Sequence, residues 1–417
     1  MKLRLTILLS LILACEIESQ ILTLDSILKA ITTSNPELRM YDERIKSAAE
    51  YAVGARSLDP PQVGAGFFMT PYNPMMWKAD DMTGSQGMGS FMVSAQQMFM
   101  NRQKRNANAN VMRGMANVDL QMQGAMRNEM YAMAKMSYYM WVTLQKKLFV
   151  LDESEKLLEY LVKSAELRYT YGMDKLSAYY KSKAMLSDIK SMRLMTEFEI
   201  IQQRISLNTL MNRNKEIVFA IDTTLPIKTF EPAGFDSSYI ASQKSQYKLI
   251  SENANLLRAR QNLERSRLKP DFGIKYDHMV GFGRQPQQFS LMGMVTIPIA
   301  PWSSKMYKSS VSGLGFEIEA LGLQQQALLN NISGALNSYQ QQIKTKKLQL
   351  DLYTTQIIPS LRKNYEVSLI AFEQNKEELF MTLDAWQNLK LIQLNYLDML
   401  YDLLQLQVNY EKELEIR

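Results

Sequence analysis

Residues 268–300 read LKPDFGIKYDHMVGFGRQPQQFSLMGMVTIPIA, and their hydrophobic pattern has a period of two. Apolar side chains occupy alternate positions in 272–280 and again in 289–299, with polar residues, glycines and methionines between them. The intervening GFGRQPQQ is polar and contains glycine and proline, which is typical of a turn. The stretch therefore predicts a β-hairpin with one apolar face, the pattern of strands in a membrane β-barrel.

The chain contains an internal duplication. Three pairs of short segments recur in the same order, at offsets of 211, 210 and 203 residues: 34–38 with 245–249, 58–60 with 268–270, and 171–176 with 374–379. Repetition in constant order indicates two copies of one structural unit. We assign the first repeat to residues 20–215 and the second to 236–417, with a linker at 216–235.

Each repeat is expected to contain a helix, a β-hairpin and a long helical hairpin. Asn35 and Pro36 form a good start for the first helix, as N-cap and first helical residue. The predicted hairpins are 61–99, with strands 62–70 and 89–98, and 270–300. Four strands cannot close a membrane barrel, so unpaired edges would remain in lipid. The chain is therefore expected to oligomerise or to pair elsewhere.

The long helical stretches are predicted at 103–170 and 304–372, with returning helices at 176–213 and 378–413. Helices of this length reach on the order of 100 Å. Their turns are placed near Gly172 and Asn375, because these residue types tolerate positive φ. Pro359 is expected to kink the second long helix. A coiled-coil stripe is predicted at Leu144, Leu148, Leu151, Leu158, Val162, Ala165 and Tyr169.

The first 19 residues form a predicted signal peptide, with basic MKLR before the apolar run LTILLSLILA. Two processing outcomes remain open: cleavage at a lipobox-like ILAC would leave a lipidated Cys15, and cleavage after Ser19 would leave Gln20. Cys15 is the only cysteine, so no disulfide is expected. No later segment has 18 uncharged apolar residues, so an exported chain of this kind is periplasmic or reaches the outer membrane through β-strands.

The order, duplication and length of these segments resemble the TolC family of outer-membrane efflux ducts over roughly residues 22–413. The stretches that carry the resemblance are LTLDSILKAITTSNPELR, SRLKPDFGIKYD, VTIPIAPWSSK, RYTYGMDKLSAYYKSKA and AFEQNKEELFMTLDAWQ. The resemblance implies a mainly α fold with a β-barrel part. In a homotrimer, four strands per protomer would build a 12-stranded barrel, and long coiled-coil helices would form a tunnel through the periplasm.

The resemblance also implies partners and sites. Tips at Gly172, Met173, Asn375 and Lys376 would contact a periplasmic adaptor, itself bound to an inner-membrane pump of the RND type. Segment 216–235 would belong to a belt around the tunnel. Asp384 would line the periplasmic aperture, where three carboxylates would favour cations, although Met381 replaces a neighbouring acidic position. The alternative reading of Asp384 is an ordinary solvated charge.

Methionine is unusually dense, with 16 of the 29 methionines in residues 69–140. Counting back from Met140 in steps of four and three gives nine positions, of which seven are methionine. This stripe is interpreted as a packing seam. Met75, Met76, Met92 and Met98 are instead candidate transient Cu(I) or Ag(I) sites, since thioethers bind soft metals. Compositional drift, or a methionine-tolerant lipid face, is the competing explanation.

The segment SAQQMFMNRQKR resembles the exit from the first hairpin in the heavy-metal branch of the family. Gln97, Lys104 and Arg105 match that pattern, whereas Met100 and Gln103 replace its proline and glycine. Metal cations are therefore the leading expected cargo. The rival cargo is organic, namely drugs, detergents or an exported protein. A non-conducting coiled-coil scaffold is the remote alternative, and the strands argue against it.

No enzyme activity and no cofactor are expected. The sequence contains no H-E-x-x-H, G-x-S-x-G, P-loop or Cys/His cluster. The single histidine, His278, falls on the apolar face of a predicted strand, where a barrel-interface role is the simpler reading. The net charge of +6 is spread without a basic block, so nucleic acid is not an expected partner.

Overall fold

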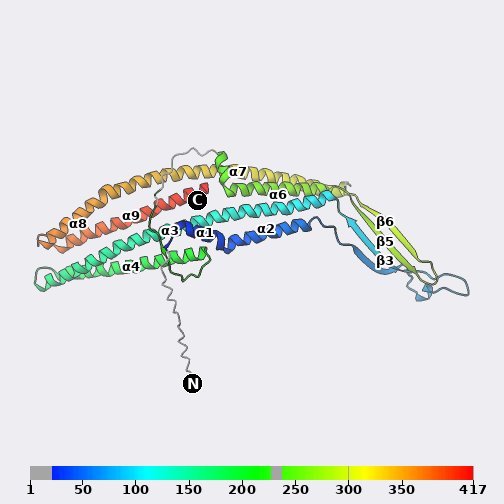
Figure 1. Ribbon diagram of the computed structural model, residues 1–417, viewed down its shortest axis with the longest axis horizontal. Coiled ribbons are helices and arrows are strands. Elements are labelled where there is room, and N and C mark those ends of the chain that lie inside the picture. Colours follow the sequence, from blue (N-terminus) through cyan, green and yellow to red (C-terminus); the bar gives the residue numbers. More distant parts are fainter. Residues whose placement is uncertain (1–20, 226, 228–236, 299, 417) are drawn as a thin grey trace, which may run out of the picture. The chain divides into compact units, whose positions relative to one another are not determined.

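The computed structural model describes residues 21–225, 227, 237–298 and 300–416 (Figure 1). The predicted signal peptide, Cys15, Ile299 and residues 226 and 228–235 of the predicted belt segment lie outside the described residues. Among the described helices, none is both long enough and apolar enough to cross a bilayer.

The chain divides into two compact units. The helical unit comprises Met1–Arg39, Met126–Gln243 and Ile332–Arg417, and the strand unit comprises Met40–Ala125 and Lys244–Asn331. Each unit takes segments from both sequence repeats, because long helices such as α3 (Arg102–Thr170) contribute residues to both. The compact units therefore cut across the duplication.

The strand unit is built around one antiparallel sheet of four strands. Its order is β2-β3-β5-β6, so each repeat supplies two neighbouring strands. The strands are β2 (Gln62–Phe68), β3 (Ser90–Phe99), β5 (Asp271–Gly281) and β6 (Gln288–Thr296). The helices that contribute to this unit are α2 (Pro36–Gly54), α3, α6 (Ser245–Arg267) and α7 (Pro301–Leu352).

Two loops of the strand unit are held together by glycine contacts. The Gly87 amide donates to the Gly283 carbonyl at 3.0 Å, and Phe282 donates to Gly89 at 3.0 Å. A Cβ atom on Gly87 would collide with the Trp77 carbonyl, so the backbones can approach only because residue 87 lacks one. The Trp77 ring stacks on Phe282 with centroids 5.5 Å apart. The long loop of the first hairpin is thus fastened to the short loop of the second.

The helical unit contains the predicted helical hairpins. Its remaining elements are β1 (Ile21–Leu22), α1 (Leu24–Ser34), α4 (Leu176–Leu210), β4 (Ala220–Ile221), α5 (Ser237–Gln243), η2 (Tyr353–Ile357), α8 (Ile358–Glu373) and α9 (Leu379–Leu414). The Asn35 side chain caps α2 by accepting the Glu37 amide at 2.9 Å, as the sequence predicts. Its amide also donates to the Leu210 carbonyl at 2.9 Å, which fastens the start of α2 to the end of α4.

The belt segment is anchored where it is described. β4 pairs in parallel with β1, and the Tyr138 hydroxyl donates to the Asp222 carbonyl at 2.7 Å. Burial raises the pKa of Tyr138 to about 12, so this donor keeps its proton at any physiological pH. The contact holds the segment that follows β4 against α3.

Pro359 interrupts the second long helix through a change of helix type. The five residues of η2 form a π-helical turn directly before α8, whose second residue is Pro359. Proline supplies no amide and crowds the preceding turn, and a wider turn accommodates both effects. The predicted kink therefore takes the form of a π-helical insertion.

The predicted coiled-coil stripe on α3 is half correct. Leu144, Leu151, Leu158 and Ala165, at a spacing of seven, are all buried. The second line of buried residues on α3 contains Ser154 and Leu161. The predicted positions Val162 and Tyr169 are partly buried and exposed, respectively. The prediction placed the second line four residues after Leu144, Leu151, Leu158 and Ala165. This spacing is wrong, because the buried residues Ser154 and Leu161 come three residues after Leu151 and Leu158. The core there includes Ile189, Phe372, Leu379 and Trp386.

The methionine stripe is not buried within one chain. All seven of its methionines are exposed or only partly buried, including Met133 at 48% exposure. Met130, Ala134 and Tyr138 are buried instead, each displaced from the stripe. A single chain therefore packs α3 mainly through residues beside the stripe, and the interpretation of the stripe as a packing seam stays a prediction.

Candidate functional site

The four strands form a sheet with two chemically different faces. In antiparallel pairs, directly opposed residues share a face. Val93 opposes His278, and His278 opposes Phe289. The whole of this apolar face consists of Val63, Ala65, Phe67, Phe91, Val93, Ala95, Gln97, Phe99, Phe272, Ile274, Tyr276, His278, Val280, Phe289, Leu291, Gly293 and Val295. His278 thus lies on the apolar face predicted for it.

The opposite face is polar and less exposed. Ser94 opposes both Gly64 and Asp277, and Gln96 opposes both Gln62 and Lys275. The Asp277 side chain is only 4% exposed and lies 3.1 Å from the Lys275 ammonium. A carboxylate this buried needs a counter-charge, which Lys275 supplies within the same strand. A sheet with one apolar and one polar face is typical of membrane β-barrels, whose strands have lipid on one side and water on the other.

The predicted tips of the helical hairpins have the same backbone geometry in both repeats. Gly172 has φ 70° and Asn375 has φ 56°, the left-handed conformation expected at each turn. Met173 donates to the Arg168 carbonyl and Lys376 to the Ala371 carbonyl, both at 2.8 Å, which closes each helix end as a Schellman motif. The predicted contact residues Gly172, Met173, Asn375 and Lys376 are all exposed.

Arg168 joins the two tips. Its guanidinium donates to the Asn375 side chain at 2.6 Å and to the Phe372 carbonyl at 3.4 Å. It also pairs with Asp174 of the first turn at 3.3 Å and lies over the Phe372 ring at 4.5 Å. Arg168 occurs in a quoted tip sequence, but sequence reasoning gave it no role. The residue at the corresponding position of the second repeat is Ala371, so this clamp exists once per chain.

The other predicted site residues lie apart from one another along the chain. Asp384 is exposed on α9, where the Asn388 amide donates to it at 3.2 Å, and Met381 is exposed one turn before it. Met75 and Met76 lie in the loop between β2 and β3, with Met75 83% exposed. Met92 and Met98 lie on the polar face, in the same register class as Ser94 and Gln96. The candidate metal positions therefore fall into a loop pair and a sheet pair.

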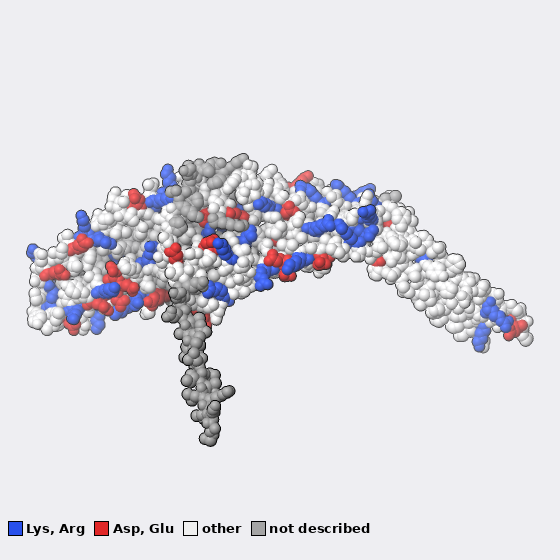
Figure 2. Space-filling view, viewed as in Figure 1, with Lys and Arg blue, Asp and Glu red and all other residues white. Residues whose placement is uncertain are grey.

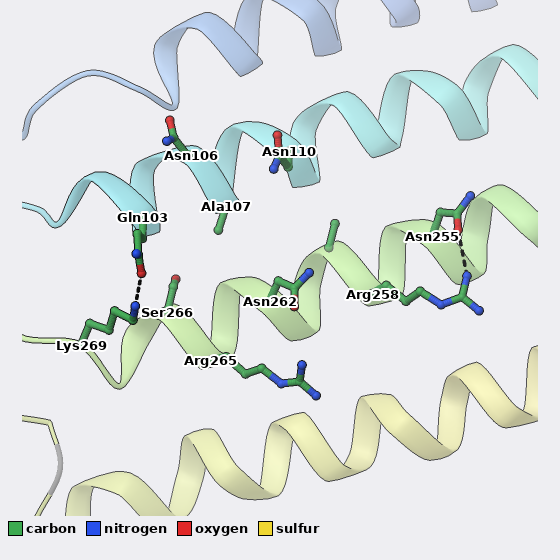
Figure 3. A pocket seen from close by; sticks show the side chains of 11 residues that line it. Gln103, Asn106, Ala107, Asn110, Asn255, Arg258, Asn262, Arg265, Ser266 and Lys269 are labelled. Atoms are coloured by element: carbon green, nitrogen blue, oxygen red, sulfur yellow. Dashed lines mark hydrogen bonds between the residues drawn. The ribbon is translucent and has the colours of Figure 1, made fainter.

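A polar groove of about 530 Å³ lies between α3 and α6 in the strand unit (Figure 3). Its lining combines the amides Asn106, Asn110 and Asn262 with the cations Arg258, Arg265 and Lys269, and it contains no acidic side chain. Lys269 donates to Gln103, and Arg258 donates to Asn255 at 2.8 Å. The groove holds no nucleophile paired with a base. Across the described residues, no three His, Cys, Asp or Glu side chains gather as a metal site.

No known protein-family profile matches the sequence, and no curated protein matches it. Solved structures do match. The CmeC outer membrane channel of Campylobacter jejuni is 14% identical, over 94% of this chain and 85% of its own, with a TM-score of 0.75. CusC, described in connection with transmembrane channel formation, is 12% identical over 94% and 91%, with a TM-score of 0.74. The MtrE outer membrane channel of Neisseria gonorrhoeae is 12% identical over 94% and 88%, with a TM-score of 0.71.

The chain has the TolC-like channel fold. The expected fold class is therefore confirmed, with two strands and one long helical hairpin from each repeat. The described strands form an open four-stranded sheet, in which β2 and β6 each have one unpaired edge.

In this TolC-like chain, the residues that resemble the heavy-metal branch form a junction of hydrogen bonds and an ion pair between strands and helices. Gln97 donates to the Asp59 carbonyl at 2.8 Å, and Arg105 donates to the Arg56 carbonyl at 2.9 Å. Lys104 forms an ion pair with Asp271, which also accepts the Asn101 amide at 2.9 Å. These bonds connect the end of β3 and the start of α3 with the segment between α2 and β2 and with the start of β5. The sequence gives no signal for the role of Asp271, because its partners are about 170 residues away.

Replacing Asp271 with asparagine is expected to destabilise this TolC-like fold by about 1–3 kcal/mol, because Lys104 would remain partly buried without its counter-charge. The measurement is the thermal unfolding midpoint of the detergent-solubilised protein, followed by circular dichroism. Asp81→Asn is the matched control, since its partner Arg284 lies at 2.9 Å but both side chains are largely exposed. Equal shifts for the two variants would show that the Lys104–Asp271 pair does not stabilise this junction.

Proposed function

We propose that the protein is the passive outer-membrane exit duct of a tripartite efflux system, extending from the outer membrane into the periplasm. The observation that supports this most directly is the four-stranded sheet with one apolar and one polar face. In a membrane barrel, the apolar side chains of such a sheet would contact lipid and its polar side chains would contact water. Energy for transport would come from a partner, because a duct of this kind needs no catalytic residues.

We propose that the protein acts as a homotrimer. The free edges of β2 and β6 are a reason to oligomerise, since unpaired backbone groups are costly in lipid. Three copies with four strands each would close one 12-stranded barrel. The methionine stripe of α3 is exposed or partly buried in a single chain. Its heptad spacing would let it pack against a helix of a neighbouring copy.

The proposed partners are a periplasmic adaptor and an inner-membrane pump of the RND type. The exposed tip residues Gly172, Met173, Asn375 and Lys376 are the proposed adaptor contacts. Asp384 is the proposed aperture residue, and its exposure on α9 allows three copies to present a ring of carboxylates. Adaptor binding at the tips would then act close to the Arg168 clamp.

Metal cations such as Cu(I) or Ag(I) are the proposed cargo. The support is the placement of Met92 and Met98 on the polar face, where a passing ion could reach their thioethers. Neutral thioethers hold such ions through exchangeable bonds, which suits transit better than storage. The rival proposal, an organic cargo or exported protein, requires no methionine on this face.

Deletion of the gene is expected to make cells hypersensitive to copper and silver salts while leaving tolerance of dyes and detergents unchanged. The measurement is growth across copper, silver, zinc, cobalt, cadmium and a panel of organic compounds. Complementation with the unaltered gene is the control. Sensitivity to organic compounds together with normal copper tolerance would replace the metal proposal with a general efflux duct. Unchanged growth in every condition would contradict the efflux role itself.

A further inference from the structure

The methionines of the sheet are sorted onto one face. The strand pairings place Met92 opposite Met279, Met292 opposite Lys275, and both Met98 and Met294 opposite Gly273. All five strand methionines therefore lie on the polar face, and none of the residues paired on the apolar face is methionine. If methionine served here as a generic apolar side chain, the apolar face would contain it. That face instead uses phenylalanine, isoleucine, leucine, valine and tyrosine.

Gly273 brings two of these methionines together. β5 lies between β3 and β6, so Met98 and Met294 start two strand spacings apart, roughly 10 Å. A Cβ atom on Gly273 would collide with the Sδ of Met98 and would lie 3.2 Å from the Cε of Met294. Both side chains therefore bend into the space that a larger residue would fill. The glycine leaves a shallow cradle into which the Met98 Sδ and the Met294 Cε both reach from the neighbouring strands.

A second methionine pair lies further along the same face. Met92 and Met279 are directly opposed, and side chains in such pairs have Cβ atoms about 4.5–5.5 Å apart. Between the two pairs lie Lys275 and Asp277, whose charges neutralise each other at 3.1 Å. The fixed charge near the methionines is therefore small, and it neither attracts hard cations strongly nor repels a monovalent soft one.

We propose that Met98 and Met294, converging over Gly273, form a binding site for a soft monovalent cation, Cu(I) or Ag(I), on the polar face of the sheet. Met92 and Met279 form the next site along that face. Thioether sulphur is a soft ligand that suits Cu(I), whereas carboxylate and carbonyl oxygens suit hard cations such as Mg²⁺ or Ca²⁺. The site deepens the proposed function, since it rests on this face lining the duct. It assigns Met279 and Met294 a role that the sequence pattern did not.

The test is a titration of the purified, detergent-solubilised protein with Ag(I) in chloride-free buffer, followed by calorimetry and by X-ray absorption at the silver edge. Ag(I) is the probe because it does not change oxidation state under these conditions. The double variant Met98→Leu/Met294→Leu preserves apolar volume and removes both sulphurs. It is expected to weaken the tightest binding at least ~10-fold and to reduce the sulphur coordination of silver.

Two further variants sharpen the result. Gly273→Ala keeps every sulphur but fills the cradle, and it is expected to weaken Ag(I) binding as well. Met82→Leu/Met88→Leu removes two exposed loop methionines and is the matched control, with unchanged binding expected. The proposal is overturned if Met98→Leu/Met294→Leu binds Ag(I) as the unaltered protein does, or if the loop control loses as much.

A conductance measurement on the same preparations separates this site from the duct itself. In planar bilayers, the unaltered protein and Met98→Leu/Met294→Leu are both expected to form pores of the same conductance. Pores without Ag(I) binding would overturn the metal site and leave the duct standing. Absence of pores in every preparation would contradict the duct, whatever the silver titration shows.

Discussion

Replacement of Lys135 by methionine is expected to lower the free energy of unfolding by about 3–5 kcal/mol. The Lys135 ammonium lies 2.6 Å from Glu411, and the two side chains are only 7% and 4% exposed. Lys135 also donates to the Ile416 carbonyl at 3.3 Å, which ties the end of the chain to α3. Removal of the ammonium would take the Lys135 hydrogen bonds away from the Glu411 carboxylate and the Ile416 carbonyl, at a position too buried for water to replace them.

Urea unfolding of the detergent-solubilised protein, followed by circular dichroism, measures this effect. Lys135→Met/Glu411→Gln is expected to recover most of the loss, because both charges of the buried pair are then removed together. Lys29→Met is the matched surface control: Lys29 lies at the same 2.6 Å from Asp25, but both side chains are about three quarters exposed, so no measurable change is expected. A Lys135→Met midpoint equal to that of the unaltered protein would show that the buried pair is dispensable.

The second large effect is expected at the helical tips. Arg168→Ala removes a guanidinium that bonds both Asn375 and the Phe372 carbonyl and pairs with Asp174. One hydrogen bond to a charged group contributes about 1.5–3 kcal/mol, so amides at both turns are expected to exchange with solvent roughly 10- to 150-fold faster. The two hairpin ends would then move independently of each other.

Hydrogen exchange by mass spectrometry on tip peptides is the direct measurement. Arg193→Ala is the control within the helical unit, because Arg193 pairs with Asp152 at 2.9 Å while remaining 41% exposed. Arg168→Lys is expected to be intermediate, since an ammonium keeps the charge but loses the planar fork. If tip exchange is equally fast in Arg168→Ala and Arg193→Ala, Arg168 does not clamp the tips. In bilayers, loss of the clamp is also expected to raise the conductance of the resting pore.

The local patterns were readable because their causes are local. The alternation in 272–280 reveals two strand faces before any pairing is known, since side chains point to opposite sides at every step. The turns at Gly172 and Asn375 follow from the few residue types that accept positive φ. The groove between α3 and α6 has no comparable sequence signal, whereas the spread of basic residues over the face in Figure 2 agrees with the lack of a basic block in the sequence.

The heptad counts on α3 show that a local pattern does not determine which face of a helix is buried. Counting identified a period at Leu144 and Leu151 and again along the methionines, but it could not say which face of the helix packs. The period depends on neighbouring residues of one helix. Burial depends on which other helices lie against it, and for the methionine stripe the same chain supplies no such neighbour that buries it.

The sequence by itself determined the duplication, the order of helices and strands, and the two faces of each strand. Only the tertiary structure decided that Met98 and Met294 both reach toward Gly273, that Arg168 bonds the turn at Asn375, and that Lys135 faces Glu411. The reason is physical: periodicity arises from side chains a few residues apart. These three contacts join residues roughly 170 to 280 positions apart, and folding alone brings them together.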